Sequence, residues 1–104
     1  MPRAVYNGTV IAESDETVIV EGNHYFPPDS LKPEFFSETP GYNTTCPWKG
    51  SASYYDVRVD DQSARGVAWT YKDPSSAAAN IKDYVAFYPK VRIEGGAKKG
   101  LFRR

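Results

Sequence analysis

The sequence predicts a small, mainly β domain, and three observations support this fold class. Aromatic residues are abundant, with 8 tyrosines, 5 phenylalanines and 2 tryptophans in 104 residues, and such side chains suit the pleated, half-buried surface of a sheet. Leucine, common in helical bundles, occurs only at Leu31 and Leu101. Short apolar stretches alternate with turn signals. Because several short strands must close or pack on a second sheet, we expect an antiparallel small barrel or a tent-like two-sheet fold with one or two short helices.

Turn signals divide the chain into short expected strands. Asn7-Gly8 marks a hairpin because both positions tolerate a positive φ. Pro27-Pro28 ends an extended piece because proline has no backbone N–H for a ladder. Asp60-Asp61 marks a polar turn, and the last two strands are expected to pair around Pro89-Lys90. The expected strands cover residues 3–6, 9–13, 17–21, 24–26, 51–59, 67–71, 84–88 and 91–94.

Two helical segments and one loop complete the expected organisation. Asp29 or Ser30 can cap a helical turn over residues 31–36, which Pro33 limits in length. Residues 73–82 are expected to form an alanine-rich helix, and residues 37–43 are expected to form a loop. The domain is expected to span residues 1–94, followed by a basic, flexible tail over residues 95–104.

Charge, apolar content and cysteine content narrow the function classes. The 13 basic and 13 acidic residues balance, so no net field favours nucleic acid or an anionic membrane. The longest apolar stretches are far shorter than the roughly 20 residues of a membrane helix. A single cysteine, Cys46, and a single histidine, His24, cannot supply a structural zinc site. We therefore expect a cytoplasmic protein without a metal site, a nucleic-acid partner or a membrane partner.

Two segments concentrate residues that can carry chemistry. Residues 44–50, Thr-Thr-Cys-Pro-Trp-Lys-Gly, hold the lone cysteine, and residues 21–26, Glu-Gly-Asn-His-Tyr-Phe, hold the lone histidine. If His24 met the Cys46 sulfur with Glu21 behind it, a nucleophile, a base and an orienting carboxylate would result. Against this, Pro47 has no N–H for an oxyanion hole, and many cysteines are simply packed. The packed interpretation is favoured.

These segments also resemble a known family. The strings over residues 21–27, 45–50, 68–71 and 85–88, with Tyr54-Tyr55 and Ile81-Lys82, resemble a bacterial and fungal family of unknown function whose most specific motif here is Thr-Cys-Pro-Trp-Lys-Gly. The family's label mentions nucleotidyltransferase. The resemblance covers about residues 4–94 and implies a compact β-rich fold like the tent-shaped small β domains, with no established activity.

Nucleotidyl transfer can be examined against the residues themselves. That chemistry needs carboxylates sharing a metal ion and a loop that holds the triphosphate. Asp60 and Asp61 are adjacent, so on a strand they would point to opposite faces. The residues after Gly50 have strand character instead of that of a phosphate-binding helix. A hairpin turn is therefore the favoured interpretation of Asp60-Asp61.

Three functions remain open from the sequence. The first is binding of a small anionic or planar molecule, and the second is hydrolysis or group transfer using Cys46 and His24. The third is a protein-interaction module; no cofactor is predicted, and whether the chain is an enzyme is left open. All depend on residues 22–26 and 44–50 being neighbours on one concave surface. The expected pocket is lined by His24, Tyr25, Cys46, Trp48, Lys49, Tyr54 and Trp69.

Overall fold

A computed structural model describes residues 1–95, and it confirms a mainly β fold. The predicted basic tail lies outside the described residues from position 96 onward. Three single turns of 3-10 helix, and no α-helix, occur within residues 1–95. The strands are β1 (Arg3–Tyr6), β2 (Thr9–Glu13), β3 (Val18–Val20), β4 (Asn23–Tyr25), β5 (Phe36–Cys46), β6 (Gly50–Val59), β7 (Gln62–Thr70), β8 (Val85–Phe87) and β9 (Arg92–Glu94). The 3-10 turns are η1 (Pro28–Ser30), η2 (Pro33–Phe35) and η3 (Ser76–Ile81).

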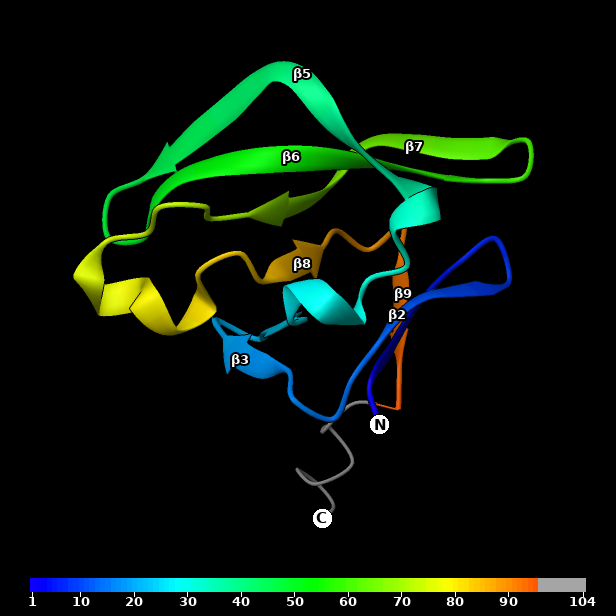
Figure 1. Cartoon of the computed structure of the whole chain (residues 1–104), viewed down its shortest axis with the longest axis horizontal. Coiled ribbons are helices and arrows are strands. Elements are labelled where there is room, and N and C mark those ends of the chain that lie inside the picture. Colours follow the sequence, from blue (N-terminus) through cyan, green and yellow to red (C-terminus); the bar gives the residue numbers. More distant parts are fainter. Residues whose placement is uncertain (96–104) are drawn as a thin grey trace.

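The strands form three antiparallel sheets that stay open over the described residues, so the expected closed barrel is not formed. The sheet orders are β5-β6-β7-β8, β2-β1-β9 and β3-β4 (Figure 1). The main-chain groups of Phe26 and Val85 exchange two hydrogen bonds of 2.8 and 2.9 Å. This bridge places the β3–β4 hairpin beside β8 and extends the largest sheet.

The predicted pairing of the last two strands is wrong. β8 pairs with β7, whereas β9 pairs with β1 at the other sheet. Tyr88 donates its N–H to the Val67 carbonyl at 2.9 Å, and Val91 donates to Tyr88 at 3.0 Å. These bonds turn the chain at Pro89-Lys90 away from β8 instead of back along it. The linker therefore connects two sheets.

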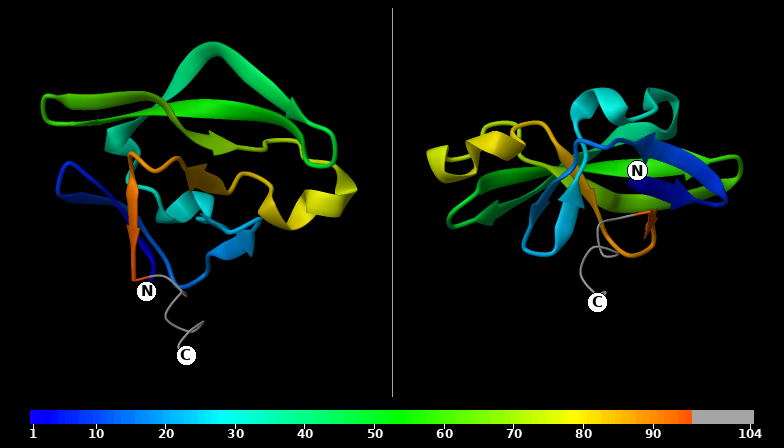
Figure 2. Two further views of the ribbon diagram at one scale, coloured as in Figure 1. Left: turned by 180° about the vertical axis from the view of Figure 1, so that it is seen from behind. Right: turned by 90° about the horizontal axis from the view of Figure 1, so that it is seen from below.

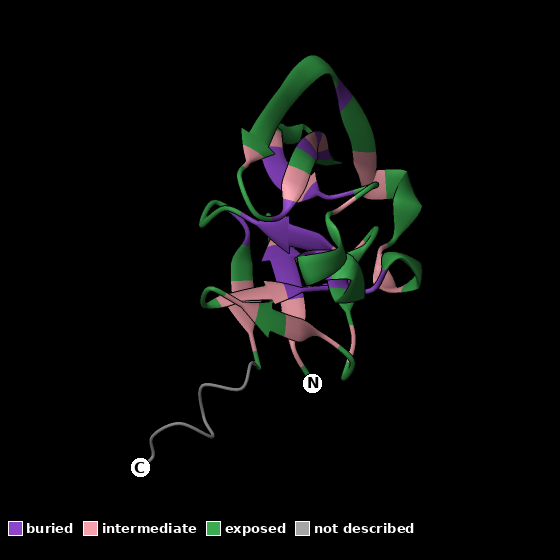
Figure 3. Cartoon of the chain, turned by 90° about the vertical axis from the view of Figure 1, so that its left-hand side faces the viewer, coloured by how far each residue is buried: buried purple, intermediate pink, exposed green. Residues whose placement is uncertain are grey.

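The predicted loop over residues 37–43 is also wrong, because these residues belong to the long strand β5. Its ladder with β6 is interrupted between the Glu38–Tyr55 and Asn43–Ser53 pairs. Residues 39–42 arch away there, and most of the strand is exposed (Figure 3). Pro40 and Gly41 lie inside this arch. These two turn-forming residues therefore produce a bulge within a strand instead of a loop between strands.

The expected helix over residues 73–82 is reduced to η3. Its backbone is not helical at Ala78, where φ is −123° and ψ is 23°. Ala78 and Ile81 are buried, and Asp83 donates its N–H to the Tyr71 carbonyl at 3.0 Å. Contacts on both sides of so short a segment override its alanine propensity. The expected helix over residues 31–36 is likewise replaced by the turns η1 and η2.

Two apolar clusters stabilise the fold. The first includes Phe26, Val57 and Val91. It lies between the β1-β2-β9 sheet and the end of the β6–β7 hairpin that is closest to its turn (Figure 2). The second includes Tyr25, Tyr54 and Tyr71. It joins the β3–β4 hairpin and η3 to the end of β6 and β7 that lies away from their turn. The second cluster supports the candidate site. No helix in residues 1–95 has the length and apolar content needed to cross a membrane.

Candidate functional site

The first part of the site is the tip of the β3–β4 hairpin. Val20 pairs with Asn23, so Glu21 and Gly22 form the two-residue turn. Both have positive φ, 54° and 83°, as a type I′ turn requires. The sequence placed this turn one residue later, at Gly22-Asn23, because Glu21 is an unusual turn residue. The turn places the Glu21 carboxylate at the outer end of the hairpin.

The second part is the tip of the β5–β6 hairpin. Cys46 pairs with Gly50, and Pro47-Trp48-Lys49 forms the loop between them. Gly50 has a φ of 112°, which a residue with a side chain rarely adopts. Trp48 is 42% exposed, whereas Lys49 is only 4% exposed and turns into the protein. The Thr-Cys-Pro-Trp-Lys-Gly motif is therefore a hairpin with an inward-pointing lysine.

The two hairpin tips meet through Glu21 and Lys49. Nζ of Lys49 donates a hydrogen bond to Oε1 of Glu21 at 2.7 Å. Nε1 of Trp48 donates to the other carboxylate oxygen at 3.3 Å. These bonds lower the pKa of Glu21, led by the bond from Lys49. The two segments that the sequence singled out are thus neighbours.

The Cys46 thiol lies against this lysine. Burial of the half-buried side chain opposes ionisation, but the N–H groups of Trp48 and Lys49 and the Lys49 ammonium favour the thiolate. Together they hold the pKa of Cys46 below its ordinary value. A proline after the cysteine leaves the next two N–H groups in the hairpin loop to act on the sulfur. The loop is therefore built to stabilise a thiolate.

Lys49 is a permanent cation in this setting. Burial alone would lower the pKa of Lys49, but the hydrogen bond to Glu21 and the contact with Cys46 raise it above its ordinary value. Nζ also lies 4.5 Å from the ring centroid of Trp48 and 5.7 Å from that of Tyr71. Burial raises the pKa of the Tyr71 hydroxyl to about 12, so this neighbour stays neutral. Lys49 can stabilise an anion but cannot accept a proton near neutral pH.

His24 has a neighbour that the sequence did not single out. Its Nδ1 shares a hydrogen bond of 3.0 Å with the hydroxyl of Thr17, the residue just before β3. His24 alternates with Tyr25 along β4, and Tyr25 faces the second cluster. The groups that shift the pKa of Cys46 are Trp48 and Lys49. The structure thus brings Cys46, Lys49 and Glu21 together and gives His24 a hydrogen bond in β3–β4.

The aromatic residues expected to line a pocket are mainly structural. Tyr25 is 1% exposed and Tyr54 is 5% exposed, so both belong to the core. Nε1 of Trp69 donates to the Tyr25 hydroxyl at 3.0 Å, with the rings edge to face. Trp69, which is half-buried, lines a hollow of about 480 Å³ together with Tyr88 and other residues from β4, β8 and β9.

Ser75 was missed by the sequence analysis. Its N–H donates to the Lys49 carbonyl at 3.0 Å, and its hydroxyl donates to the Trp48 carbonyl. Both bonds fasten the loop that carries the thiol. In the sequence, Asp73-Pro74-Ser75 indicated only the start of a helix. That interpretation does not predict hydrogen bonds from Ser75 to a hairpin about 27 positions earlier in the chain.

The geometry does not resemble a metal-dependent nucleotidyl transfer site. Asp60 lies in the β6–β7 turn with a φ of 56°, which confirms the predicted hairpin turn. Among residues 1–95, no three histidine, cysteine or acidic side chains gather in a group that could hold a metal ion. At the two hairpin tips, the groups that meet are the Cys46 thiol, the Lys49 ammonium and the Glu21 carboxylate.

The fold and the site together define a small β domain with a cysteine–lysine hairpin. Residues 2–97 match the family model described as Domain of unknown function (DUF427), whose short label refers to NTP transfer. The chain belongs to this family. A search of curated proteins found no match to the chain.

Proposed function

We propose that Cys46 is a reactive thiolate through which this domain binds and transfers a group from a small electrophilic molecule. The observation that supports this is the position of the sulfur against the Lys49 ammonium and the N–H groups of Trp48 and Lys49. Thiolates, not thiols, are the nucleophiles in cysteine chemistry. A cytoplasmic location fits this proposal, since a reducing compartment keeps a lone thiol free.

The hairpin favours attack of the thiolate on an electrophilic sulfur over acyl transfer, which needs an oxyanion hole beside the nucleophile. Pro47 cannot donate the N–H that often stabilises an oxyanion next to a nucleophile. The next two N–H groups stabilise the sulfur itself. In the proposed step, the Cys46 thiolate attacks one sulfur of a small disulfide, an Sγ–S bond forms, and the other sulfur departs as a thiolate with the bonding electron pair. A second thiolate then attacks the mixed disulfide, carries the group away as a new disulfide and restores the Cys46 thiolate.

No separate general base is required in this proposal. The thiolate is already favoured before the electrophile arrives, and Lys49 balances its charge. Glu21 orients Lys49 from the opposite hairpin and so acts as a positioning residue. As an alternative within the same transfer reaction, His24 donates a proton to the leaving group.

The proposal is tested by alkylation with iodoacetamide at pH 7, followed by intact mass. Because Cys46 is the only cysteine, each added group reports this site alone. The wild type should react faster than an unfolded sample, and K49M should react several-fold slower because the thiolate fraction falls. K72M is the matched control, since Lys72 pairs with Glu38 on the exposed surface. Equal rates for the wild type and K49M would contradict the proposal.

A second candidate is noncovalent binding of a planar anion in the hollow beside Trp69. The ring centroids of Trp69 and Tyr88 are 4.6 Å apart, and Arg92 lines the same hollow. Arg92 pairs with Glu94, so these groups suit stacking of a flat molecule whose acidic group shares Arg92 with that carboxylate. The dye 1-anilinonaphthalene-8-sulfonate is a suitable probe. Its binding should weaken in Y88A but not in I19A, since Ile19 is exposed and is not a lining residue of this hollow; equal binding by both variants would remove this candidate.

A further inference from the structure

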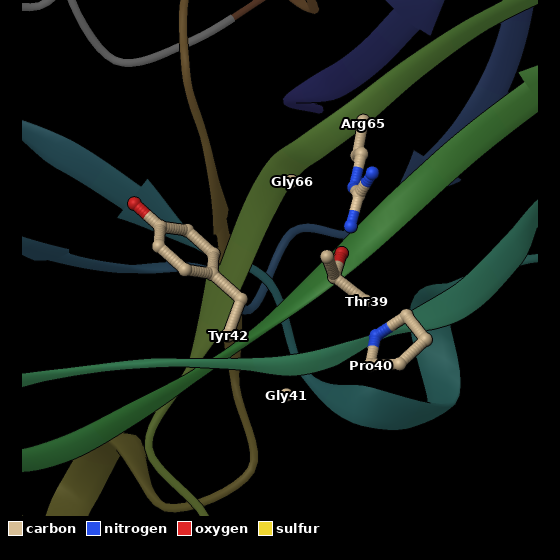
Figure 4. A pocket seen from close by; sticks show the side chains of 6 residues that line it. All are labelled: Thr39, Pro40, Gly41, Tyr42, Arg65 and Gly66. Atoms are coloured by element: carbon tan, nitrogen blue, oxygen red, sulfur yellow. The ribbon is translucent and has the colours of Figure 1, made fainter.

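A separate pocket of about 500 Å³ opens in the largest sheet, apart from the thiol. It is lined by Thr39, Pro40, Gly41, Tyr42, Arg65 and Gly66 (Figure 4). None of these residues was singled out by the sequence. The pocket arises where two ladders are interrupted: residues 39–42 of β5 oppose Tyr54, and residues 65–67 of β7 oppose Asp56. Two bulges on neighbouring strands thus leave room in the same region.

Asp56 on β6 binds both of the strand segments that leave the ladder, one on β5 and one on β7. Its Oδ1 accepts a hydrogen bond from the Thr39 hydroxyl on β5 and one of 2.8 Å from the Gly66 N–H on β7. Thr39 is only 6% exposed, so its bond to the carboxylate is shielded from water. One side chain on the central strand therefore ties together the two pocket walls. The pocket is preformed, which lowers the entropy cost of binding.

The walls of the pocket combine a cation with an aromatic surface. Arg65 is exposed, and no carboxylate within residues 1–95 forms an ion pair with it. Its guanidinium points toward Thr39, while Tyr42 lies on the other side of Gly66 (Figure 4). The Tyr42 ring is 49% exposed and packs on Tyr54 at a centroid distance of 4.6 Å. An accessible ring and a guanidinium thus line the same pocket.

Gly66 lies beside the Tyr42 ring. A Cβ at this position would lie 3.8 Å from two ring atoms of Tyr42, which is ordinary van der Waals contact. The φ of Gly66, 62°, disfavours any residue with a side chain. A glycine here therefore keeps this part of the pocket wall free of a side chain.

We propose that this pocket binds a small aromatic monocarboxylate. The carboxylate pairs with the two-pronged guanidinium of Arg65, and the ring packs against Tyr42. A single negative charge is favoured because Arg65 is the one cation among the lining residues and the Asp56 carboxylate lies directly behind Thr39 and Gly66. A doubly charged phosphate would face more repulsion from Asp56 than a carboxylate does. The inference does not depend on Cys46 or on the proposed thiol chemistry.

The test is titration of the full chain with benzoate, phenylacetate and indole-3-carboxylate, followed by amide signals in ¹⁵N NMR spectra. At least one of these acids should shift the Gly41 and Gly66 signals saturably, and benzyl alcohol and inorganic phosphate should bind more weakly. R65A should lose about ten-fold or more in affinity, because a charge-assisted hydrogen bond is removed. R65K should lose less affinity, since lysine keeps the positive charge but cannot form the two parallel hydrogen bonds of the guanidinium.

R58A is the matched control, because Arg58 is an exposed arginine on the neighbouring strand β6. It should bind like the wild type. D56N should narrow the difference in affinity between the acids and phosphate, because it removes the negative charge behind Thr39 and Gly66. The proposal is overturned if none of the three acids shifts the Gly41 and Gly66 signals, if R65A and R58A bind equally, or if phosphate binds as tightly as the best acid.

Discussion

Nζ of Lys49 and Oε1 of Glu21 lie 2.7 Å apart, although 28 positions separate the two residues along the chain. Each occupies the tip of a hairpin, β5–β6 for the lysine and β3–β4 for the glutamate. These hairpins lie at opposite edges of the extended sheet. Strand β5 is the edge strand on one side, and the β3–β4 hairpin adjoins β8 on the other. The ion pair thus brings the two edges together and fixes the lysine that contacts the thiol.

The ion pair predicts a specific pH dependence of stability. Lys49 lowers the folded-state pKa of Glu21 below its ordinary value of 4.5. A depressed carboxyl pKa stabilises the fold above the ordinary value, and this contribution is lost as the pH falls through the folded value. The wild type should therefore exceed E21Q in free energy of unfolding at pH 6, and the difference should shrink below pH 4.5. Urea unfolding at several pH values measures it. A difference that is the same at every pH would count against the pair.

Phe26 should be among the most costly core residues to truncate. It is fully buried, packs edge-on against Phe87 at 5.7 Å between ring centroids, and carries the backbone bridge to β8. F26A should lower the free energy of unfolding by about 3–5 kcal/mol, because it removes apolar contacts and leaves a cavity. I19A is the control, since Ile19 is 51% exposed, and its cost should stay within about 0.5 kcal/mol. Similar costs for both would show that the core is placed incorrectly.

The hydroxyl of Tyr25 has a structural role that can be isolated. It accepts the indole N–H of Trp69 at 3.0 Å inside the second cluster. Y25F keeps the ring but leaves this N–H without its acceptor, so we expect a loss of about 1–3 kcal/mol. The Trp69 indole proton signal should also shift. Y42F serves as the control because Tyr42 is exposed; equal stability of Y25F and Y42F would refute the role of this bond.

Gly50 should be less replaceable than Gly22, although both have positive φ. A Cβ on Gly50 would meet the Asp73 carbonyl oxygen and the Pro74 Cα, each at 3.4 Å, whereas one on Gly22 would enter open space. G22A should therefore cost roughly 1 kcal/mol from backbone strain alone. G50A should cost more, and it should also slow alkylation because Gly50 pairs with Cys46. Thermal unfolding and the alkylation rate test this, and the prediction fails if G50A is the milder change.

Local signals predicted much of the fold correctly. Asn7-Gly8 and Asp60-Asp61 are turns with positive φ at Asn7 and Asp60, and the predicted strand over residues 51–59 corresponds to β6. Such features depend on near neighbours in the chain. The partners of β8 and β9 were predicted incorrectly because pairing depends on contacts across the whole molecule. The helix over residues 73–82 failed for the same reason, since Ser75 and Ile81 are held by tertiary contacts.

The site was predictable only in part. The clustering of unusual residue types pointed to Cys46, Lys49 and Glu21, which the structure brings together. Their geometry was not predictable, because the direction of Lys49 depends on a carboxylate 28 positions away. The pocket between Tyr42 and Arg65 left no sequence signal, since it comes from two ladder interruptions that only the paired strands reveal.

The most direct test of the thiolate site is the pKa of Cys46 itself. Selective ¹³Cβ labelling of cysteine gives a single signal, because Cys46 is the only cysteine, and its chemical shift follows ionisation of the thiol. The account predicts a midpoint clearly below the ordinary value of about 8.5, and a higher midpoint in K49M. K49M should remain folded, since the Glu21 carboxylate that it leaves unpaired is 54% exposed and can be solvated, and circular dichroism checks this. A wild-type midpoint at or above about 8.5 in the folded protein would contradict the account.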